Sequence, residues 1–141
     1  MLIAQLSDPH VREPGVRYQG VVNSSRMFAQ ALAHLDTLDR RPDLIVLTGD
    51  LVDHGRPAEY QEVRRLLATT TIPWLAMAGN HDEREAFRAA FQDQTCLPRE
   101  GPLHYCVDQY PVRIVAVDDP ALKHEIRIAA DADQDSIRLR P

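Results

Sequence analysis

The sequence predicts an α/β protein with a mostly parallel sheet and helices on one face. Short apolar runs alternate with longer segments in which apolar residues recur every three or four positions, as expected when strands alternate with amphipathic helices. Polar residues also follow each of the first three apolar runs. The carboxyl ends of parallel strands meet at one edge of a sheet, and open α/β sheets bind ligands there.

Three short apolar runs are the expected strands of the parallel sheet. They span residues 2–6, 44–47 and 74–77 and are rich in branched or bulky side chains. That composition is typical of strands buried on both faces. Residues 103–107 and 112–117 are two further expected strands, which we interpret as an antiparallel pair.

The segments between the strands are expected to be helices at residues 24–39, 58–68 and 83–91. Ser24 and Ser25 can cap the first helix. Its expected buried stripe consists of Met27, Phe28, Ala31, Leu32 and Leu35. The inward residues of the other two are expected to be Tyr60, Val63, Leu66 and Leu67 in the second, and Phe87, Ala90 and Phe91 in the third.

Three polar segments follow the first three strands and suggest a metal site. They are Ser7-Asp8-Pro9-His10, Thr48-Gly49-Asp50 and Gly79-Asn80-His81-Asp82. Alternate residues of an extended chain point the same way, so the side chains of Asp8 and His10 can reach one ion.

In this order, the three segments resemble the first three signature blocks of the calcineurin-like metallophosphoesterases, which are D-x-H, G-D and G-N-H-[DE]. Pro42-Asp43 and the run Gly-Arg-Pro-Ala-Glu-Tyr at residues 55–60 look similar to the bacterial class III cyclic-nucleotide phosphodiesterases and glycerophosphodiesterases. The resemblance covers about residues 1–117. It implies the first half of an α/β/β/α sandwich, that is, the N-terminal part of a metallophosphoesterase domain.

The resemblance implies a centre of two divalent cations that hydrolyses 3′,5′-cyclic nucleotides or similar small phosphodiesters. Asp50 would bridge the two metals, Asp8 and His10 would hold the first, and Asn80 would hold the second. His81 would be the catalytic residue that contacts the phosphate or protonates the leaving alkoxide, and Asn80 would also touch the substrate. Carboxylate, imidazole and amide ligands suit Mn²⁺, Fe²⁺, Zn²⁺ or Co²⁺.

Several polar residues near these segments have simpler interpretations. Asp and Asn also end strands and cap helices, although capping does not require the neighbouring histidines. We expect Asp82 to cap the following helix, and Asp53 and His54 to be ordinary loop residues. His34 is expected on a helix surface, and His104 to be structural.

Residues 118–141 do not match the family pattern, and this leaves two functions open. We find no later metal-binding histidine, no G-H-x-H block and no counterpart of the second sheet. The chain is therefore either a truncated, weakly active enzyme or a noncatalytic remnant that binds one cation weakly. In the tail, Ile126 with Ile128 and Ile137 with Leu139 could form edge strands, or the tail could come from a shifted reading frame or an early stop.

Composition limits the classes of partner that this chain is expected to bind. A net charge of −5 argues against a general nucleic-acid surface. Arg12, Arg17 or Arg56 could attract a small anionic substrate. We expect a cytoplasmic protein, since no apolar run spans a membrane and no cleavable leader is evident, with Cys96 and Cys106 as free thiols. No G-x-G-x-x-G or P-loop pattern follows a strand, which disfavours an unrelated nucleotide-binding protein.

The missing second sheet predicts a chain that is marginally stable or associates. Without that sheet, one face of the strands would be uncovered. The residues expected to lose their cover are Ile3, Ile45, Leu47, Leu75 and Val115. Homo-oligomers would then form through this face.

Overall fold

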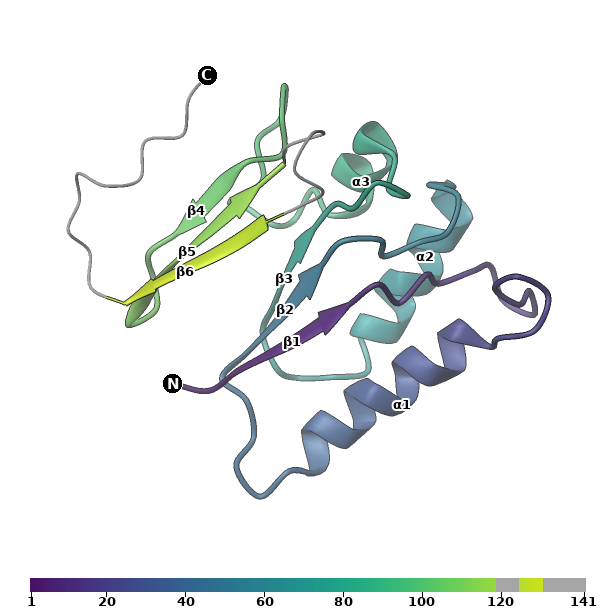
Figure 1. Ribbon diagram of the computed structural model, residues 1–141, viewed down its shortest axis with the longest axis horizontal. Helices are drawn as coiled ribbons and strands as arrows, with labels where there is room; N and C mark the ends of the chain where they lie inside the picture. The colour runs from purple at the N-terminus through teal and green to yellow at the C-terminus, as the bar shows by residue number, and fades with distance from the viewer. Residues whose placement is uncertain (119–124, 131–141) are drawn as a thin grey trace.

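The computed structural model describes residues 1–118 and 125–130, and within them three parallel strands are followed by an antiparallel sheet (Figure 1). The parallel sheet has the order β1-β2-β3, with β1 at Ile3–Ser7, β2 at Leu44–Thr48 and β3 at Trp74–Met77. The helices that follow these strands are α1 at Ser24–Thr37, α2 at Pro57–Leu67 and α3 at Arg84–Ala90. The predicted fold class is confirmed.

The second sheet, which we expected to lack a counterpart, is represented by three antiparallel strands. They are β4 at Tyr105–Val107, β5 at Val112–Val117 and β6 at Glu125–Ala130, in the order β4-β5-β6. The antiparallel pair β4–β5 was predicted, and β6 confirms the edge strand expected around Ile126 and Ile128. The strand expected at Ile137 and Leu139 lies outside the described residues.

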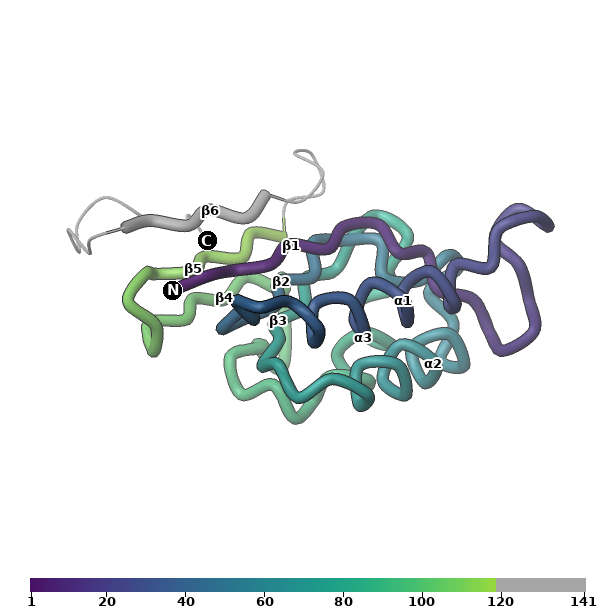
Figure 2. The backbone as a smooth tube through the Cα atoms, turned by 90° about the horizontal axis from the view of Figure 1, so that it is seen from below, coloured from purple at the N-terminus to yellow at the C-terminus, as the bar shows by residue number. Residues whose placement is uncertain are grey.

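The parallel sheet separates two hydrophobic cores, because successive side chains of a strand point to opposite faces. Ile45 and Leu47 of β2 pack with the helices, whereas Leu44 and Val46 pack with the second sheet. Figure 2 shows the helices on one side of β1–β3 and β4–β5 beyond the other.

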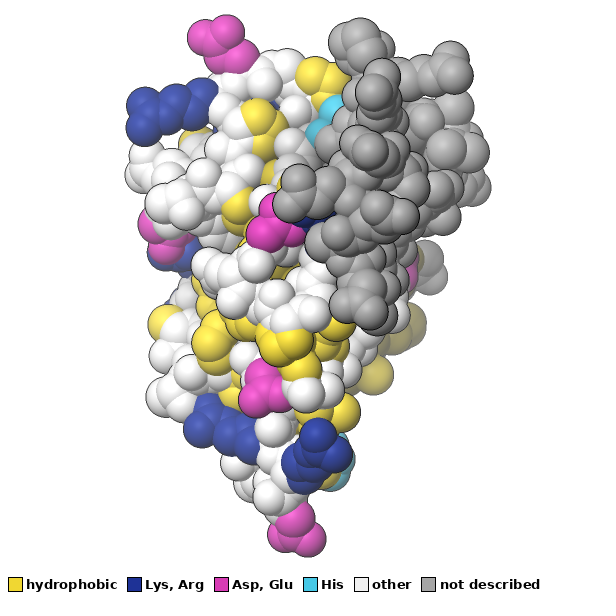
Figure 3. Space-filling model, turned by 90° about the vertical axis from the view of Figure 1, so that its left-hand side faces the viewer, with side chains coloured by type: hydrophobic (Ala, Val, Ile, Leu, Met, Phe, Trp, Pro, Cys, Tyr) yellow, Lys and Arg dark blue, Asp and Glu magenta, His cyan; other side chains and the backbone are white. Residues whose placement is uncertain are grey.

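The face that we expected to be uncovered is therefore covered, and this expectation was wrong. Ile45 and Leu47 are fully buried and Leu75 is 8% exposed, while Val115 belongs to the covering sheet and is 1% exposed. Only Ile3 of that set stays half-buried, because β1 is an edge strand. Hydrophobic side chains on the face in Figure 3 lie among acidic and basic ones. Association of the chain stays a prediction.

Details of α1 also differ from expectation. Asn23 caps the helix by accepting a hydrogen bond from Arg26 N–H, whereas Ser25 Oγ donates to the carbonyl of Arg12. Phe28 and Leu32 are buried as predicted, but Met27 is 61% exposed.

Cys96 and Cys106 are free thiols. None of the described helices combines the length and the apolar character needed to cross a membrane.

Candidate metal centre

The polar segments after β1 and β2 are held side by side by backbone hydrogen bonds. Asp8 N–H donates to the carbonyl of Gly49 at 3.2 Å, His10 N–H to that of Asp50 at 3.0 Å, and Val11 N–H to that of Leu51 at 2.9 Å. The loop after β1 thus continues parallel to the loop after β2, at the carboxyl edge of the sheet (Figure 1). This pairing brings Asp8 and His10 to Asp50.

Asp8, His10 and Asp50 form a cluster that could hold a cation. Each offers one ligand atom, and the three atoms lie within 4.8 Å of one another. His10 Nε2 is 3.9 Å from a carboxylate oxygen of Asp50, which is only 8% exposed. His10 Nδ1 is buried without a hydrogen-bond partner among the described residues. A ring nitrogen and two carboxylates are suitable donors for a first-row divalent metal.

The backbone at these three residues is in an uncommon conformation. Asp8, His10 and Asp50 have φ values of 53°, 41° and 46°, and Gln19 is the only other non-glycine residue with positive φ in the described part of the chain. Left-handed backbone costs on the order of 1–3 kcal/mol per non-glycine residue and concentrates at functional sites. Asp8 and His10 therefore meet through this turn and not through the extended geometry that we expected.

The loop after β3 presses against Asp50 from the other side. A Cβ atom at Gly79 would overlap the backbone nitrogen and a carboxylate oxygen of Asp50 and lie 2.8 Å from its Cα, so only glycine fits. His81 N–H donates to Asp50 Oδ1 at 2.9 Å. Asn80, exposed at the rim, is thus flanked by two residues that both contact Asp50.

His81 lies beside His10 and is oriented by Asp53. The two imidazole rings meet edge to face at 4.8 Å. His81 Nδ1 is 2.8 Å from the carbonyl oxygen of Asp53, and since a carbonyl can only accept, Nδ1 is the donor. This hydrogen bond raises the pKa of His81, and the nearby charges of Asp50 and Asp53 add to the increase.

Comparison with known proteins identifies the family. The family model described as calcineurin-like phosphoesterase matches residues 1–129. The chain belongs to the calcineurin-like phosphoesterase family. The match runs past residue 117, where we expected the family-like sequence to end.

Relatives of this phosphoesterase chain include named phosphodiesterases. It is 31% identical over 126 residues to the glycerophosphodiester phosphodiesterase GpdQ of Enterobacter lignolyticus, a match that covers 88% of the chain and 45% of the relative. It is 31% identical over 127 residues to a cAMP/cGMP dual specificity phosphodiesterase of Mycobacterium tuberculosis, covering 87% and 39%. A probable GpdQ of Arcobacter nitrofigilis is 26% identical over 118 residues, covering 84% and 43%. The chain therefore spans less than half the length of each.

Asp53, which we interpreted as an ordinary loop residue, lies in the candidate metal centre. Ligand atoms of His10, Asp53 and His81 form a second group within 4.8 Å of one another. Arg12 Nη1 lies 2.6 Å from Asp53 Oδ2, and Arg12 Nε lies 2.9 Å from buried Glu59. Arg12 thus fixes the loop that orients His81, and its charge is already paired with carboxylates. The sequence offered one signal, the spacing of Asp53 three residues after Asp50, but did not show its partner.

Asp82 connects the loops after β2 and β3 to helix α2 and does not cap α3. Its carboxylate accepts hydrogen bonds from Gly79 N–H at 2.6 Å, Leu51 N–H at 3.1 Å and the Tyr60 hydroxyl at 2.9 Å. Burial raises the pKa of Asp82 to about 6 despite these bonds. The cap of α3 is Glu83, which accepts from the backbone of Glu85 and Ala86. The expected role of Asp82 was therefore assigned one residue too early.

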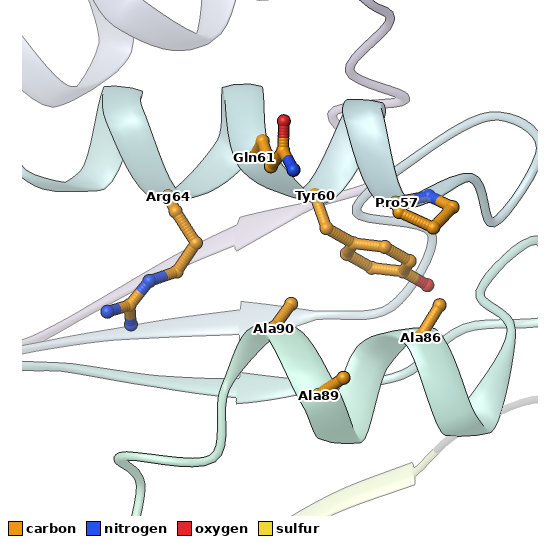
Figure 4. Close-up of a pocket in the computed structure, with 7 residues that line it drawn as sticks. All are labelled: Pro57, Tyr60, Gln61, Arg64, Ala86, Ala89 and Ala90. Atoms are coloured by element: carbon orange, nitrogen blue, oxygen red, sulfur yellow. The ribbon is translucent and has the colours of Figure 1, made fainter.

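Tyr60 reaches this loop from the groove between two helices. Figure 4 shows its ring projecting from α2 between Ala86 and Ala90 of α3, where it lines a pocket of about 370 Å³. Glu83 N–H donates to the Tyr60 hydroxyl at 3.0 Å. The helix layer and the candidate metal centre are thus joined by a hydrogen-bonded chain from Tyr60 through Asp82 to Gly79.

The donors in the candidate metal centre fit the metals that the family uses, which are generally two divalent ions. Asp8, His10 and Asp50 are together as predicted, and His10 Nδ1 is a buried nitrogen without a partner in the described part of the chain. Asn80 lies between Gly79 and His81 in the chain, and both of these residues contact Asp50. Two other histidines agree with their expected roles: His104 Nδ1 accepts a structural hydrogen bond from Asp118 N–H, and His54 is an exposed loop residue beside Asp53.

Proposed function

We propose that this chain provides the first half of a two-metal phosphodiesterase centre that hydrolyses 3′,5′-cyclic nucleotides or similar small phosphodiesters. The observation that supports this most is the convergence of Asp8, His10 and Asp50 in strained backbone at one sheet edge. Relatives named as phosphodiesterases support the reaction class. Bound divalent ions would supply charge neutralisation of the phosphate and a nucleophile near neutral pH.

The positions of these residues support the following ligand roles. Asp8 and His10 would hold one ion, and Asp50, buried between the loops after β1 and β3, would be shared by both. Asn80 would add an amide oxygen to the second ion. Mn²⁺, Fe²⁺, Zn²⁺ and Co²⁺ all accept this mixture of donors.

His81 would hold the proton for the leaving alkoxide. Because Nδ1 donates to the carbonyl of Asp53, Nε2 is the nitrogen that can exchange a proton with the substrate. The hydrogen bond to Asp53 raises the pKa of His81, which favours the protonated form of the ring. Asn80 and His81 are thus the residues of this chain that would touch the phosphate.

A cation-binding module without catalysis is the second candidate. Asp8, His10 and Asp50 lie together and could hold the first ion, whereas the proposed roles leave Asp50 and Asn80 for the second. Two ligands and water would bind an ion weakly, so one bound cation per chain without turnover is the behaviour that this candidate predicts.

The test is hydrolysis of bis(p-nitrophenyl) phosphate by the purified chain with added Mn²⁺. The phosphodiesterase proposal expects release of p-nitrophenol that Asp50→Ala abolishes. Asp39→Ala is the matched control, since Asp39 is exposed between α1 and β2, at the opposite edge of the sheet. Metal binding without release of p-nitrophenol would favour the binding module.

A further inference from the structure

A pocket of about 380 Å³ opens next to the candidate metal ligands, between the loop after β1 and helix α1. Asp8 and His10 line one end of it. The rest of the lining is mostly apolar and includes Tyr18, Val22 and Phe28. Pockets of roughly 300–1,000 Å³ with few polar groups are typical of small-molecule sites.

The walls of this pocket expose large hydrophobic side chains. Met27 is 61% exposed and Val22 is 37% exposed, and both line the pocket. Met27 belongs to the sequence stripe that we expected to be buried, yet it faces this space and not the helix-side core. An apolar ligand group here would remove water from both side chains, which is favourable.

The pocket also contains a buried hydroxyl that lacks a partner. Ser24, 5% exposed, lines the pocket, and its Oγ makes no hydrogen bond within the described residues. Burying an unsatisfied hydroxyl is unfavourable. A polar atom on a bound group would satisfy it.

Tyr18 joins the pocket to the metal ligands. Its ring stacks on His10 with centroids 4.7 Å apart and planes 24° apart. The loop is held by the bridge between Tyr18 and Val22, and the Gln19 side chain donates to the Tyr18 hydroxyl at 3.1 Å. The aromatic wall of the pocket therefore starts at the imidazole that would bind the metal.

We propose that this pocket accommodates the organic group on the ester oxygen that is not cleaved in an acyclic phosphodiester substrate, and that this group is an apolar ring with one hydrogen-bonding atom for Ser24. This inference rests on the proposed function, because it places the phosphate at the metals near Asp8 and His10. An ester group that extends from that phosphate towards α1 enters the pocket directly. The pocket thus determines which diesters bind well.

The test uses two reporters on the full chain loaded with Zn²⁺. The chain has three methionines, Met1, Met27 and Met77, so ¹³C-methyl labelling gives one pocket signal and two internal controls. The ³¹P signal of the ligand reports the phosphate. Diphenyl phosphate is expected to shift the Met27 methyl signal saturably, whereas dimethyl phosphate is expected to leave it in place.

Variants at Met27 and Ser24 then test how each side chain contributes to ligand binding. Met27→Ser is expected to weaken diphenyl phosphate binding, followed by ³¹P, about tenfold. Val21→Ser, on the loop before α1 and outside the pocket, is the control and is expected to bind as the wild type does. Replacing one phenyl group with 3-pyridyl is expected to tighten wild-type binding about fivefold and to have no effect in Ser24→Ala.

The outcomes separate the two proposals. Binding of diphenyl phosphate by ³¹P without movement of the Met27 signal would overturn the pocket assignment and leave the phosphodiesterase proposal intact. A saturable Met27 shift in a chain that hydrolyses no diester would support the pocket and contradict the phosphodiesterase proposal. No response from either reporter would overturn the pocket assignment.

Discussion

At the candidate metal centre, the backbone conformation and the space around single residues matter as much as the chemistry of their side chains. Asp8, His10 and Asp50 have positive φ, and Gly79 makes room for Asp50. From the sequence, the grouping of Asp8, His10 and Asp50 could be predicted, because these residues follow two short strands at the same edge of the sheet. The left-handed turn that joins Asp8 to His10 could not, since it depends on pairing with residues 49–51.

Gly79→Ala tests the close approach to Asp50. The added methyl group would displace the Asp50 backbone, so the affinity for Mn²⁺ should fall by about 10- to 100-fold, as for other residues that support metal ligands. Titration calorimetry measures this. Gly15→Ala is the control, because its φ of 84° strains the backbone of alanine but no atom lies near the added methyl group, so the affinity for Mn²⁺ should not change. Equal affinity of Gly79→Ala and the wild type would contradict the geometry.

Asp8 tests whether the centre stores backbone strain. With φ of 53°, glycine at position 8 should be more stable than alanine by about 1 kcal/mol. Urea unfolding of Asp8→Gly and Asp8→Ala in the presence of EDTA measures the difference, and both variants lack the metal-binding carboxylate. If alanine were as stable as glycine, residue 8 would not be strained.

At the scale of elements, local patterns predicted the strands and helices well, and tertiary contacts changed the details. The structure caps α1 with Asn23 and α3 with Glu83, and Met27, which was expected to be buried, is exposed. Helix periodicity identifies a buried face but does not show where the neighbouring layer ends, which explains the error at Met27. The role of Asp82 depends on Tyr60 and Leu51, which are distant in sequence.

A pH-dependent ion pair links α3 to the second sheet. Arg84 donates two hydrogen bonds to Asp118, after β5, and Leu103 N–H donates a third. Burial alone would raise the pKa of Asp118, but these hydrogen bonds outweigh it and lower the pKa below 3.8. A lowered folded-state pKa stabilises the fold above the unfolded value, and that stability is lost as the pH falls through the folded value.

Asp118→Asn should therefore flatten the acid limb of the stability profile. We expect the wild type to lose free energy of unfolding below about pH 4 more steeply than Asp118→Asn does. Urea unfolding at several pH values measures this, and Arg84→Gln should flatten the profile in the same direction. An unchanged slope in both variants would mean that the pair does not titrate as described.

At the scale of the whole molecule, the two sheets should unfold together. The second core joins β2 and β3 to β4 and β5, and Ile114 of β5 is fully buried in it. The sequence predicted the β4–β5 pair but not this cover, because the cover depends on packing between β4–β5 and β2–β3, which are distant in the sequence.

Ile114→Ala should lower the free energy of unfolding by about 2–5 kcal/mol, since it leaves a cavity between the sheets. Trp74, the only tryptophan, lies in β3 and packs against Phe91 on the helix side. Its fluorescence therefore reports the parallel sheet, not the mutated one. A Trp74 transition that does not move in Ile114→Ala would show that the two layers unfold independently.

The most direct measurement of the metal centre is the amount of Mn²⁺ bound to the chain, determined by electron paramagnetic resonance of the free ion during titration. We predict at least one tightly bound ion per wild-type chain. We also predict loss of that ion in Asp50→Ala and unchanged binding in Asp39→Ala. Wild-type binding no stronger than that of Asp50→Ala would contradict the assignment of Asp8, His10 and Asp50 as metal ligands.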